Sequence, residues 1–281
     1  MLGKTCIITG ATSGIGQAAA FALAGKGARI VIVARDRRRA DVTLDKLRAI
    51  NPNAAHRAYL ADLSGISEMK RVAAEISASE PRIDVLINNA GALFSYRKTT
   101  ADGFERTFAL NHLAYFVLTH GLIERVRASA PARIVNTSSG IHKRARLDLD
   151  DLQCSRGYDG VTAYERSKLC NVLFTRELAR RLTGTGVTAN SFHPGLVASR
   201  FGNRSNGLFT PLFFVIKTVF GLSAEAGART LVYLASSPEV GSVSGKYFEN
   251  CTEVLPGRWA EDDEAAARLW RESAGMTDID W

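Results

Sequence analysis

The chain has 281 residues, of which 46% are hydrophobic and 23% are charged, proportions that exclude a disordered chain and are ordinary for a globular protein with a sizeable core. Lysine and arginine outnumber aspartate and glutamate by 36 to 28, and the resulting net charge of +8 could attract nucleic acid, an acidic membrane surface or a phosphorylated small molecule. Because the basic residues are not interleaved with aromatic side chains, we expect no nucleic-acid partner.

Apolar, β-branched runs of strand length alternate with amphipathic stretches of helical length along the whole chain. Strands are predicted at Lys4–Thr9, Ala28–Ala34, His56–Ala61, Asp84–Asn88, Ala132–Thr137, Gly186–Phe192 and Ser244–Glu249. Helices are predicted at Gly16–Gly25, Arg37–Ile50, Ser67–Ser79, Gly103–Arg127, Tyr164–Arg181, Ala224–Ala235 and Asp263–Ser273. The strand runs are almost continuously apolar, as in a parallel sheet covered on both faces. We therefore predict an α/β fold in one domain over residues 1–281, with a doubly wound, parallel, seven-stranded sheet.

The turn Thr9–Gly16 joins the first strand to the first helix and has glycines in the order Gly-x-x-x-Gly-x-Gly. Glycines let a backbone approach a pyrophosphate, and the N-terminus of the helix offers free N–H groups and a positive dipole end. The spacing differs from the more familiar Gly-x-Gly-x-x-Gly. We interpret Thr9–Gly16 as a dinucleotide-binding turn, with an ordinary glycine-rich turn as the alternative.

The second strand ends at Ala34, and Arg35 and Asp36 follow it. An acidic residue at the strand end would bond the ribose 2′-hydroxyl of NAD, whereas an arginine there can pair with the 2′-phosphate of NADP. A solvated basic loop is the alternative, and the nearby Asp36 leaves NAD(H) open. We expect NADP(H) in preference to NAD(H).

Polar side chains also follow the next strands, in Asp62-Leu63, Asn88–Gly91 and Ser138-Ser139. Ligands of open α/β sheets bind at these carboxyl ends, although each residue could instead cap a helix or form a turn. Asn111 lies inside the predicted helix Gly103–Arg127, where asparagine is a poor helix former. A buried polar side chain in such a place usually has a hydrogen-bonding role.

Tyr164 and Lys168 lie four residues apart at the front of a predicted helix, so their side chains share one face. A free tyrosine has a pKa near ~10, and a neighbouring ammonium lowers the pKa of a phenol. We therefore expect Lys168 to make Tyr164 an acid–base group. The alternative is an ordinary pair on an amphipathic helix.

Between Ser139 and Tyr164, the polar segment Ile141–Gly160 is expected to form a surface loop. The sixth strand leads into Pro194-Gly195, and the most apolar stretch of the chain, Leu208–Phe220, follows. Thirteen residues are too few to cross a bilayer. We favour a substrate lid over about 196–222, covering a lipophilic pocket; a core helix, a subunit interface or a peripheral membrane contact are the alternatives. A C-terminal tail over 256–281 has no predicted role.

The four cysteines, Cys6, Cys154, Cys170 and Cys251, lack the spacing of a metal site or a disulfide framework. Three of them lie in or beside apolar runs, so we expect buried thiols, no bound metal and a cytoplasmic location. The first apolar run meets the glycine-rich turn within a few residues. We therefore expect neither a signal peptide nor a transmembrane segment.

In order and spacing, these motifs resemble those of the short-chain dehydrogenase/reductases over practically the whole chain. The matching pieces are Thr9–Gly16, Asp62, Asn88–Gly91, Asn111, Ser138-Ser139, Tyr164 with Lys168, and Pro194-Gly195. The stretches Asn136–His142, Leu173–Leu182, His193–Gly195 and Ser244–Cys251 resemble the retinol dehydrogenase group. Animal members of that group usually carry an N-terminal membrane anchor, whereas this sequence begins almost directly with its first strand.

The resemblance implies a Rossmann fold and an NADP(H)-dependent oxidoreductase that acts on a small hydrophobic carbonyl or alcohol. Tyr164 would be the general acid in reduction, and Lys168 would lower its pKa and hold the nicotinamide ribose. Ser139, with Ser138 as second candidate, would orient the substrate, and Asn111 would complete a proton relay. The positions expected to line the dinucleotide are Gly10, Thr12, Ser13, Gly14, Ile15, Gly16, Arg35, Asp62, Leu63, Asn89, Ala90, Gly91, Tyr164, Lys168, Pro194, Gly195 and Val197.

Two further alternatives stay open at this point. A dinucleotide-binding regulator or scaffold without catalysis would keep the same fold, but it has no need of the four intact groups Asn111, Ser139, Tyr164 and Lys168. Members of the family are commonly dimers or tetramers, so a homo-oligomer stands beside a monomer.

Overall fold

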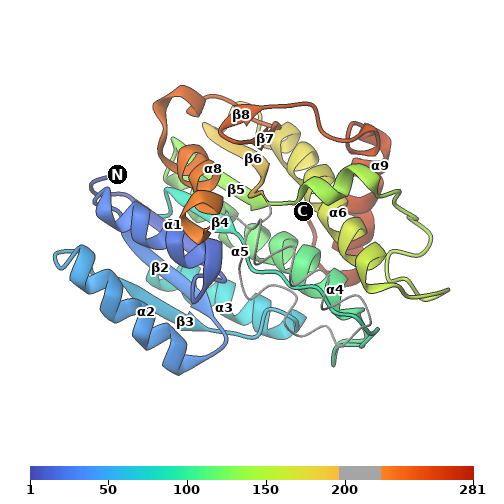
Figure 1. Cartoon of the computed structure of the whole chain (residues 1–281), viewed down its shortest axis with the longest axis horizontal. Helices are drawn as coiled ribbons and strands as arrows, with labels where there is room; N and C mark the ends of the chain where they lie inside the picture. The colour runs from blue at the N-terminus through green and yellow to red at the C-terminus, as the bar shows by residue number, and fades with distance from the viewer. Residues whose placement is uncertain (196–222) are drawn as a thin grey trace.

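The chain folds around an eight-stranded sheet in the order β3-β2-β1-β4-β5-β6-β7-β8. In Figure 1, β3 and β8 lie at opposite sides of this sheet. The computed structural model describes residues 1–195 and 223–281. The strands are β1 (Thr5–Thr9), β2 (Arg29–Ala34), β3 (Arg57–Leu60), β4 (Val85–Asn88), β5 (Ala132–Thr137), β6 (Val187–His193), β7 (Tyr247–Glu249) and β8 (Thr252–Glu253). The first seven pair in parallel, which confirms the predicted doubly wound α/β fold.

The eighth strand was not predicted, because the sequence around it has no ordinary hairpin signal. β8 pairs antiparallel with β7 across the two residues Asn250 and Cys251, which have φ values of 49° and 63°. Two consecutive left-handed residues make the turn that best fits the twist of a hairpin, and Asn-Gly is its usual sequence. Because Cys251 takes the second position, where glycine is usual, the sequence does not indicate this turn.

The helices lie within a few residues of their predicted bounds. They are α1 (Gly14–Gly25), α2 (Arg37–Ile50), α3 (Ile66–Ser79), α4 (Arg106–Phe108), α5 (Ala114–Ala128), α6 (Gly160–Arg181), α8 (Ala224–Ser236) and α9 (Asp263–Thr277). The predicted helix Gly103–Arg127 is a helical run from Arg106 to Ala128, in which a π-helical turn, Ala109–Leu113, separates α4 from α5. Helix α6 begins earlier than predicted because the Asp159 carboxylate accepts a hydrogen bond from the Thr162 N–H.

The two faces of the sheet carry separate cores because successive side chains of a strand point to opposite sides. Ile7 packs with α3, α5 and α6, whereas its neighbour Ile8 packs with α1, α2 and α8. Helix α9 lies outside α6, beside it in Figure 1, and stacks Trp270 on Phe174 of α6 at a centroid distance of 5.7 Å. The C-terminal helix therefore adds a further layer over the face that carries α6.

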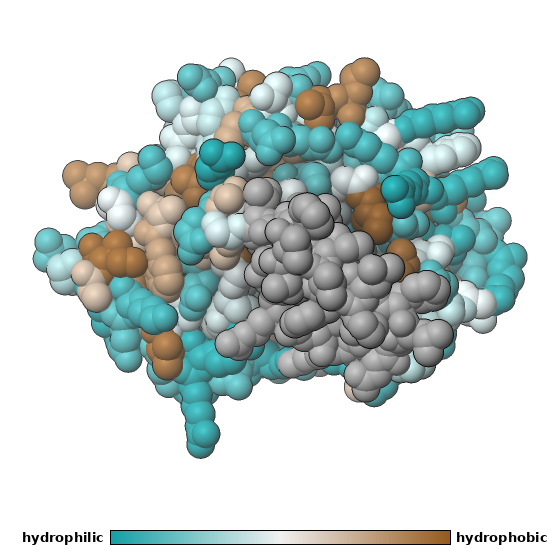
Figure 2. Space-filling view, viewed as in Figure 1, coloured by the Kyte–Doolittle hydropathy of each residue, from teal (hydrophilic) through white to brown (hydrophobic). Residues whose placement is uncertain are grey.

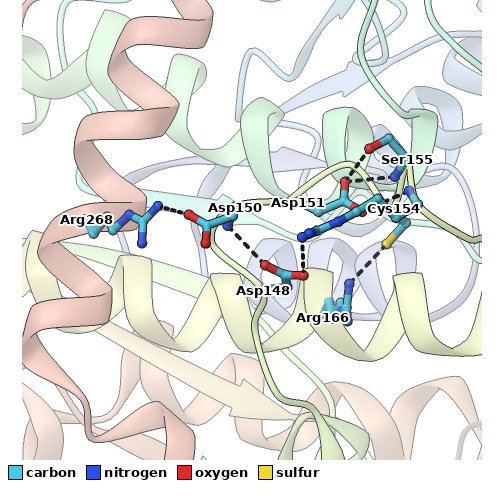
Figure 3. A network of polar contacts seen from close by, with 8 residues as sticks. Asp148, Asp150, Asp151, Cys154, Ser155, Arg166 and Arg268 are labelled. Carbon is cyan, nitrogen blue, oxygen red and sulfur yellow. Dashed lines mark hydrogen bonds and ion pairs between the residues drawn. The ribbon is translucent and has the colours of Figure 1, made fainter.

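The segment Ile141–Gly160 is only partly the surface loop that its polar composition predicts. It begins in a short 3-10 turn, Gly140–Arg144, and it buries His142 and Leu152. Several of its charged residues have ion-pair partners: Asp150 pairs with Arg268 of α9 (Figure 3). Arg156 Nη2 lies 2.7 Å from Asp148 Oδ2. The segment is thereby attached to α9.

All four cysteines are free thiols: Cys6, Cys154 and Cys170 are buried, Cys154 within the segment expected to be a surface loop, and Cys251 is partly exposed. None of the helices within residues 1–195 and 223–281 has the length and apolar content needed to cross a bilayer. On the face shown in Figure 2, the described surface is mostly hydrophilic, with apolar residues in small separate groups. Such scattered exposure is ordinary for a protein surface in water. The predicted lid over 196–222 lies outside the described residues.

Candidate active site

Most of the predicted site residues come from the turns that follow the parallel strands, so they lie together at the carboxyl ends of the strands, whereas Asn111, Tyr164 and Lys168 come from helical segments. The glycine-rich turn follows β1, and Asn89-Ala90-Gly91 follows β4. Because β1 pairs with both β2 and β4, the strand order reverses between β1 and β4. Open α/β sheets bind ligands at such a switch point, outside the carboxyl ends of the strands.

The glycines of the first turn allow it to pack directly against the turn after β4. A Cβ atom on Gly10, where φ is +70°, would lie 2.9 Å from the Ala90 Cα atom. A Cβ atom on Gly16 would lie 2.4 Å from Asn89 Nδ2. Any larger residue would push the two turns apart. The Thr9 hydroxyl reinforces the contact by accepting hydrogen bonds from the N–H groups of Asn89 and Ala90, both at 2.9 Å.

The N-terminus of α1 keeps its first N–H groups available, which fits a pyrophosphate. Ser13 stands at the N-cap position in extended conformation but makes no side-chain capping bond. By contrast, Asp36, Asp159 and Asp262 cap α2, α6 and α9. An uncapped helix start after a tight glycine turn is a ready anion site. The predicted residues Thr12, Gly14 and Ile15 belong to the same turn and first helical residues.

Two arginines lie beside this turn. Arg35 Nη1 is 3.6 Å from Asp62 Oδ2, and both side chains are about half exposed. Arg39 Nη2 donates to the Thr12 carbonyl at 3.0 Å. Sequence reasoning noted the arginine cluster but selected Arg35 alone, so Arg39 is an additional candidate for a phosphate contact. The Asp62 carboxylate also accepts from Ser64, and the Leu63 side chain is buried in the core.

Asn89 connects three strand ends. Its Nδ2 donates to the Thr9 carbonyl at 3.0 Å, and its Oδ1 accepts from the Thr137 hydroxyl at 3.4 Å. Gly91, two residues further on, is exposed. A Cβ atom there would lie 3.2 Å from Asn111 Oδ1 and 3.4 Å from Lys168 Nζ. Asn111 and Lys168 therefore both lie close to Gly91, beyond the carboxyl end of β4. Predicted cofactor-binding and catalytic residues come together at this place.

Asn111 occupies the π-helical turn between α4 and α5. Its Oδ1 accepts from the Ala92 N–H at 2.9 Å, and its Nδ2 donates to the Ala92 carbonyl at 2.9 Å and to Ser167 Oγ at 3.0 Å. Turns of this kind are rare and occur frequently at functional sites. The widened turn explains how a fully buried asparagine is accommodated within a helix.

Lys168 is buried in an unusual environment for an amine. Its Nζ donates to the Thr137 carbonyl at 3.2 Å and lies 5.7 Å from the centroid of the Tyr115 ring and 5.5 Å from that of Tyr164. Burial lowers the pKa of this amine from 10.5 to about 7. Lys168 can therefore both hold and release a proton near neutrality.

Tyr164 differs from the sequence-based expectation in its electrostatics. Burial raises the pKa of its phenol, and the hydrogen bond with the Ser139 side chain opposes this only in part. The predicted lowering of this pKa by Lys168 is therefore wrong, because burial favours the neutral form of both groups. The phenol stays protonated at neutral pH, which is the form that a general acid requires.

The structure distinguishes the two serines that follow β5. Ser138 is buried, and its hydroxyl donates to the Lys168 carbonyl at 2.8 Å. Ser139 is only partly buried and is bonded to Tyr164. Ser138 therefore connects the end of β5 to α6, and Ser139, the less buried of the two, is the serine that lies beside the Tyr164 phenol.

The remaining predicted positions follow β6. Pro194 and Gly195 come directly after the strand, and Gly195 has φ +81°. Val197 lies outside the described residues. Within the part of the chain that the structure describes, no cluster of three or more histidine, cysteine or acidic side chains could hold a metal ion.

Comparison with known proteins gives consistent matches. The family model described as short chain dehydrogenase matches residues 4–207. Retinol dehydrogenase 14 from Homo sapiens is 42% identical over 296 residues, which span 99% of this chain and 88% of that protein. A crystal structure of an uncharacterized protein from Mycobacterium paratuberculosis is 31% identical, with a TM-score of 0.79 over 99% of this chain and 95% of its own. The Pseudomonas aeruginosa protein RhlG, solved as an active-site complex with NADP, is 26% identical, with a TM-score of 0.70 over 92% of this chain and 97% of its own.

Proposed function

The chain belongs to the short-chain dehydrogenase family, and we propose that it transfers a hydride between NADP(H) and a carbonyl or alcohol carbon of a hydrophobic substrate. The observation that carries this proposal is the convergence of four groups at the carboxyl edge of the sheet. Asn111 and Lys168 lie beside the exposed Gly91, and Ser139 is bonded to the buried phenol of Tyr164. A non-catalytic dinucleotide binder has no use for this constellation.

The glycine-rich turn supports a dinucleotide cofactor, and the arginines support NADP(H). The uncapped start of α1 suits the pyrophosphate, and Arg35 and Arg39 are the side chains that we assign to an adenosine 2′-phosphate. Arg35 would exchange its weak pairing with Asp62 for the stronger charge of the phosphate. The NADP complex of the related RhlG supports the same preference.

When bound, the nicotinamide supplies the hydride in reduction and accepts it in oxidation. In the reductive direction, the phenol of Tyr164 gives its proton to the substrate oxygen as the carbonyl carbon becomes a carbinol. The Ser139 hydroxyl donates a hydrogen bond to the same oxygen and keeps it beside the phenol. Lys168, with a pKa of about 7, returns a proton toward Tyr164, and Asn111 holds the adjoining Ala92 backbone in place.

The surroundings of Tyr164 support an apolar substrate. Gly160 lets the segment Phe94–Tyr96 lie against the start of α6, since a Cβ atom there would be 2.3 Å from the Phe94 carbonyl oxygen. Next to this contact in the chain, Tyr96 is 62% exposed and Val161, one helical turn before Tyr164, is 47% exposed, so two large apolar side chains are exposed in these packed segments. The retinol dehydrogenases among the relatives are named for a lipophilic alcohol, which supports the same substrate class.

The test is the consumption of reduced cofactor in the presence of a panel of carbonyl compounds. A polyene aldehyde, a long-chain alkyl aldehyde and an aryl ketone should be reduced, whereas a sugar aldehyde of similar reactivity should not. We expect kcat/KM for NADPH to exceed that for NADH at least ~10-fold, because a charge-assisted bond is worth about 1.5–3 kcal/mol. Binding of NADPH without turnover on any carbonyl would refute the proposal in favour of a regulatory dinucleotide binder.

A further inference from the structure

A buried histidine connects the loop of Ser139 to the C-terminal segment. His142 lies in the short turn after Ser139 and is 1% exposed. Its Nδ1 lies 2.6 Å from the Ser139 carbonyl oxygen, and its Nε2 lies 3.2 Å from the backbone nitrogen of Gly257. The imidazole thus bridges residues that are more than a hundred positions apart in the sequence.

The two contacts determine the proton positions on the ring. The Gly257 N–H can only donate, so Nε2 must accept and carries no proton. The Ser139 carbonyl can only accept, so Nδ1 carries the proton and donates it. One neutral tautomer satisfies both partners, and burial, which lowers the pKa of His142, favours this neutral form.

The ring is held from several sides. It packs edge-on against the Tyr247 ring of β7 at a centroid distance of 4.8 Å. Gly257 approaches so closely that a Cβ atom there would lie 2.7 Å from the Lys143 Cα atom. On the other side of the loop, a Cβ atom on Gly140 would lie 3.2 Å from the His193 ring. The ring packing on Tyr247 and the two hydrogen bonds therefore restrict the imidazole, and the two close glycine contacts restrict the loop that carries it.

Ser139 depends on this contact because, apart from its hydrogen bond with the Tyr164 phenol, its own side chain does little to fix the loop. Its hydroxyl accepts from the Ile141 N–H only at the long distance of 3.5 Å, and its backbone is extended, with φ −160°. Its carbonyl, by contrast, accepts from both the N–H and the Nδ1 of His142, at 3.1 and 2.6 Å. The orientation of the Ser139 peptide is therefore fixed mainly at the carbonyl.

We propose that His142 is a positioning residue that fixes the catalytic Ser139 by donating a hydrogen bond from Nδ1 to its carbonyl, while the Gly257 N–H holds the imidazole in the tautomer that carries this proton. This inference rests on the proposed function, since it assigns His142 a part in the same reaction. It also gives the C-terminal tail a supporting role: the Gly257 N–H occupies Nε2 and so keeps the proton of the neutral ring on Nδ1. A misplacement of a reacting group by about 1 Å can lower a rate by up to ~100-fold.

Two near-isosteric substitutions separate the two bonds. In His142→Asn, the side-chain amide nitrogen takes the place of Nδ1 and can still donate to the Ser139 carbonyl. In His142→Gln, the amide oxygen reaches the place of Nε2 and can still accept from Gly257, but the donor to Ser139 is lost. Ser273→Ala is the matched control: it removes a 2.9 Å buried hydrogen bond between α9 and His112 without touching Ser139.

We expect His142→Gln to lower kcat between about 10- and about 100-fold with an unchanged KM for NADPH, whereas His142→Asn and Ser273→Ala stay within about threefold of the wild type. All three variants should lose thermal stability. A purely structural role for His142 would instead make kcat follow stability, so a loss in His142→Asn as large as in His142→Gln would overturn the inference. Wild-type kcat in His142→Gln would overturn it as well.

Amide hydrogen exchange of residues 139–142 gives a readout that needs no turnover. Exchange should accelerate in His142→Gln relative to His142→Asn, and equal rates would refute the positioning role. If the wild type shows no turnover but the exchange rates differ as expected, the proposed function fails while the contact stands. If the wild type turns over and the exchange rates are equal, only the inference about His142 fails.

Discussion

Replacing Lys168 by methionine should make the protein more stable while abolishing turnover. Lys168 is 2% exposed, and no ion pair to it is found among the described residues. Burial lowers the pKa of its amine from 10.5 to about 7. Methionine has similar length and no charge to desolvate. The Thr137 carbonyl would keep its hydrogen bond from Asn171 Nδ2, at 3.1 Å.

The sign and size of the effect follow from proton linkage. Between pH 7 and 10.5 the unfolded chain holds a proton on Lys168 that the folded chain has released, so wild-type stability rises with pH across this window. At about 1.4 kcal/mol per pKa unit, the difference between the pKa values of Lys168 in the unfolded and folded chains corresponds to roughly 5 kcal/mol of unfolding free energy. In Lys168→Met, loss of the hydrogen bond to the Thr137 carbonyl reduces this gain in stability by about 1 kcal/mol. Lys168→Met should therefore be more stable by roughly 4 kcal/mol at pH 7 and below.

Urea unfolding of the wild type and Lys168→Met, measured from neutral pH up to about pH 10.5, tests this account. The difference in unfolding free energy should be largest at neutral pH and shrink steadily as the pH rises. Lys46→Met, at an exposed position on α2, is the control and should show little difference at any pH. The argument is that the fold buries the Lys168 amine for its function, although desolvation of the charged amine costs stability. A Lys168→Met variant that is less stable than the wild type, or a difference in unfolding free energy that does not change with pH, would refute it.

Three further predictions concern the serines and the arginine. Ser139→Ala should lower kcat by about 100-fold or more and cost less stability than Ser138→Ala, because Ser139 is only partly buried and water can replace its hydroxyl beside Tyr164; thermal melts and steady-state kinetics check both values. Ser138→Ala should instead cost about 1 kcal/mol of stability through the lost bond to Lys168, and unfolding of the two variants side by side would expose a reversed assignment. Arg35→Asp should move the preference from NADPH toward NADH, measured as the ratio of the two kcat/KM values; an unchanged ratio would transfer the phosphate contact to Arg39.

The strands could be predicted from the sequence alone, and with them the carboxyl ends of the strands, where the site residues lie. Nearly continuous apolar runs such as Arg29–Ala34 predict strands reliably, because both faces of a parallel strand are buried and composition alone then indicates the strand. Once the strand ends are known, the rule that ligands bind at carboxyl ends places Gly10, Asn89 and Ser139 together. The resemblance to the dehydrogenase family then assigned their roles.

The features that could not be predicted depend on contacts distant in the sequence. The pKa of Tyr164 depends on how deeply the fold buries it, which the spacing to Lys168 does not report. The polar segment Ile141–Gly160 looks like a solvated loop because its partners, including Arg268 and Gly257, lie more than a hundred residues away. The role of Ser138 likewise became clear only from its bond to a backbone carbonyl.

The most direct test of the central claim is to follow the transferred hydrogen. Wild-type protein is supplied with NADPH deuterated at the transferred position and a hydrophobic aldehyde, and the product alcohol is analysed by mass spectrometry. The account predicts deuterium at the carbinol carbon with the wild type. It also predicts a loss of turnover of about 100-fold or more with Tyr164→Phe, which should still bind NADPH normally. Full turnover by Tyr164→Phe, or an alcohol without deuterium, would contradict it.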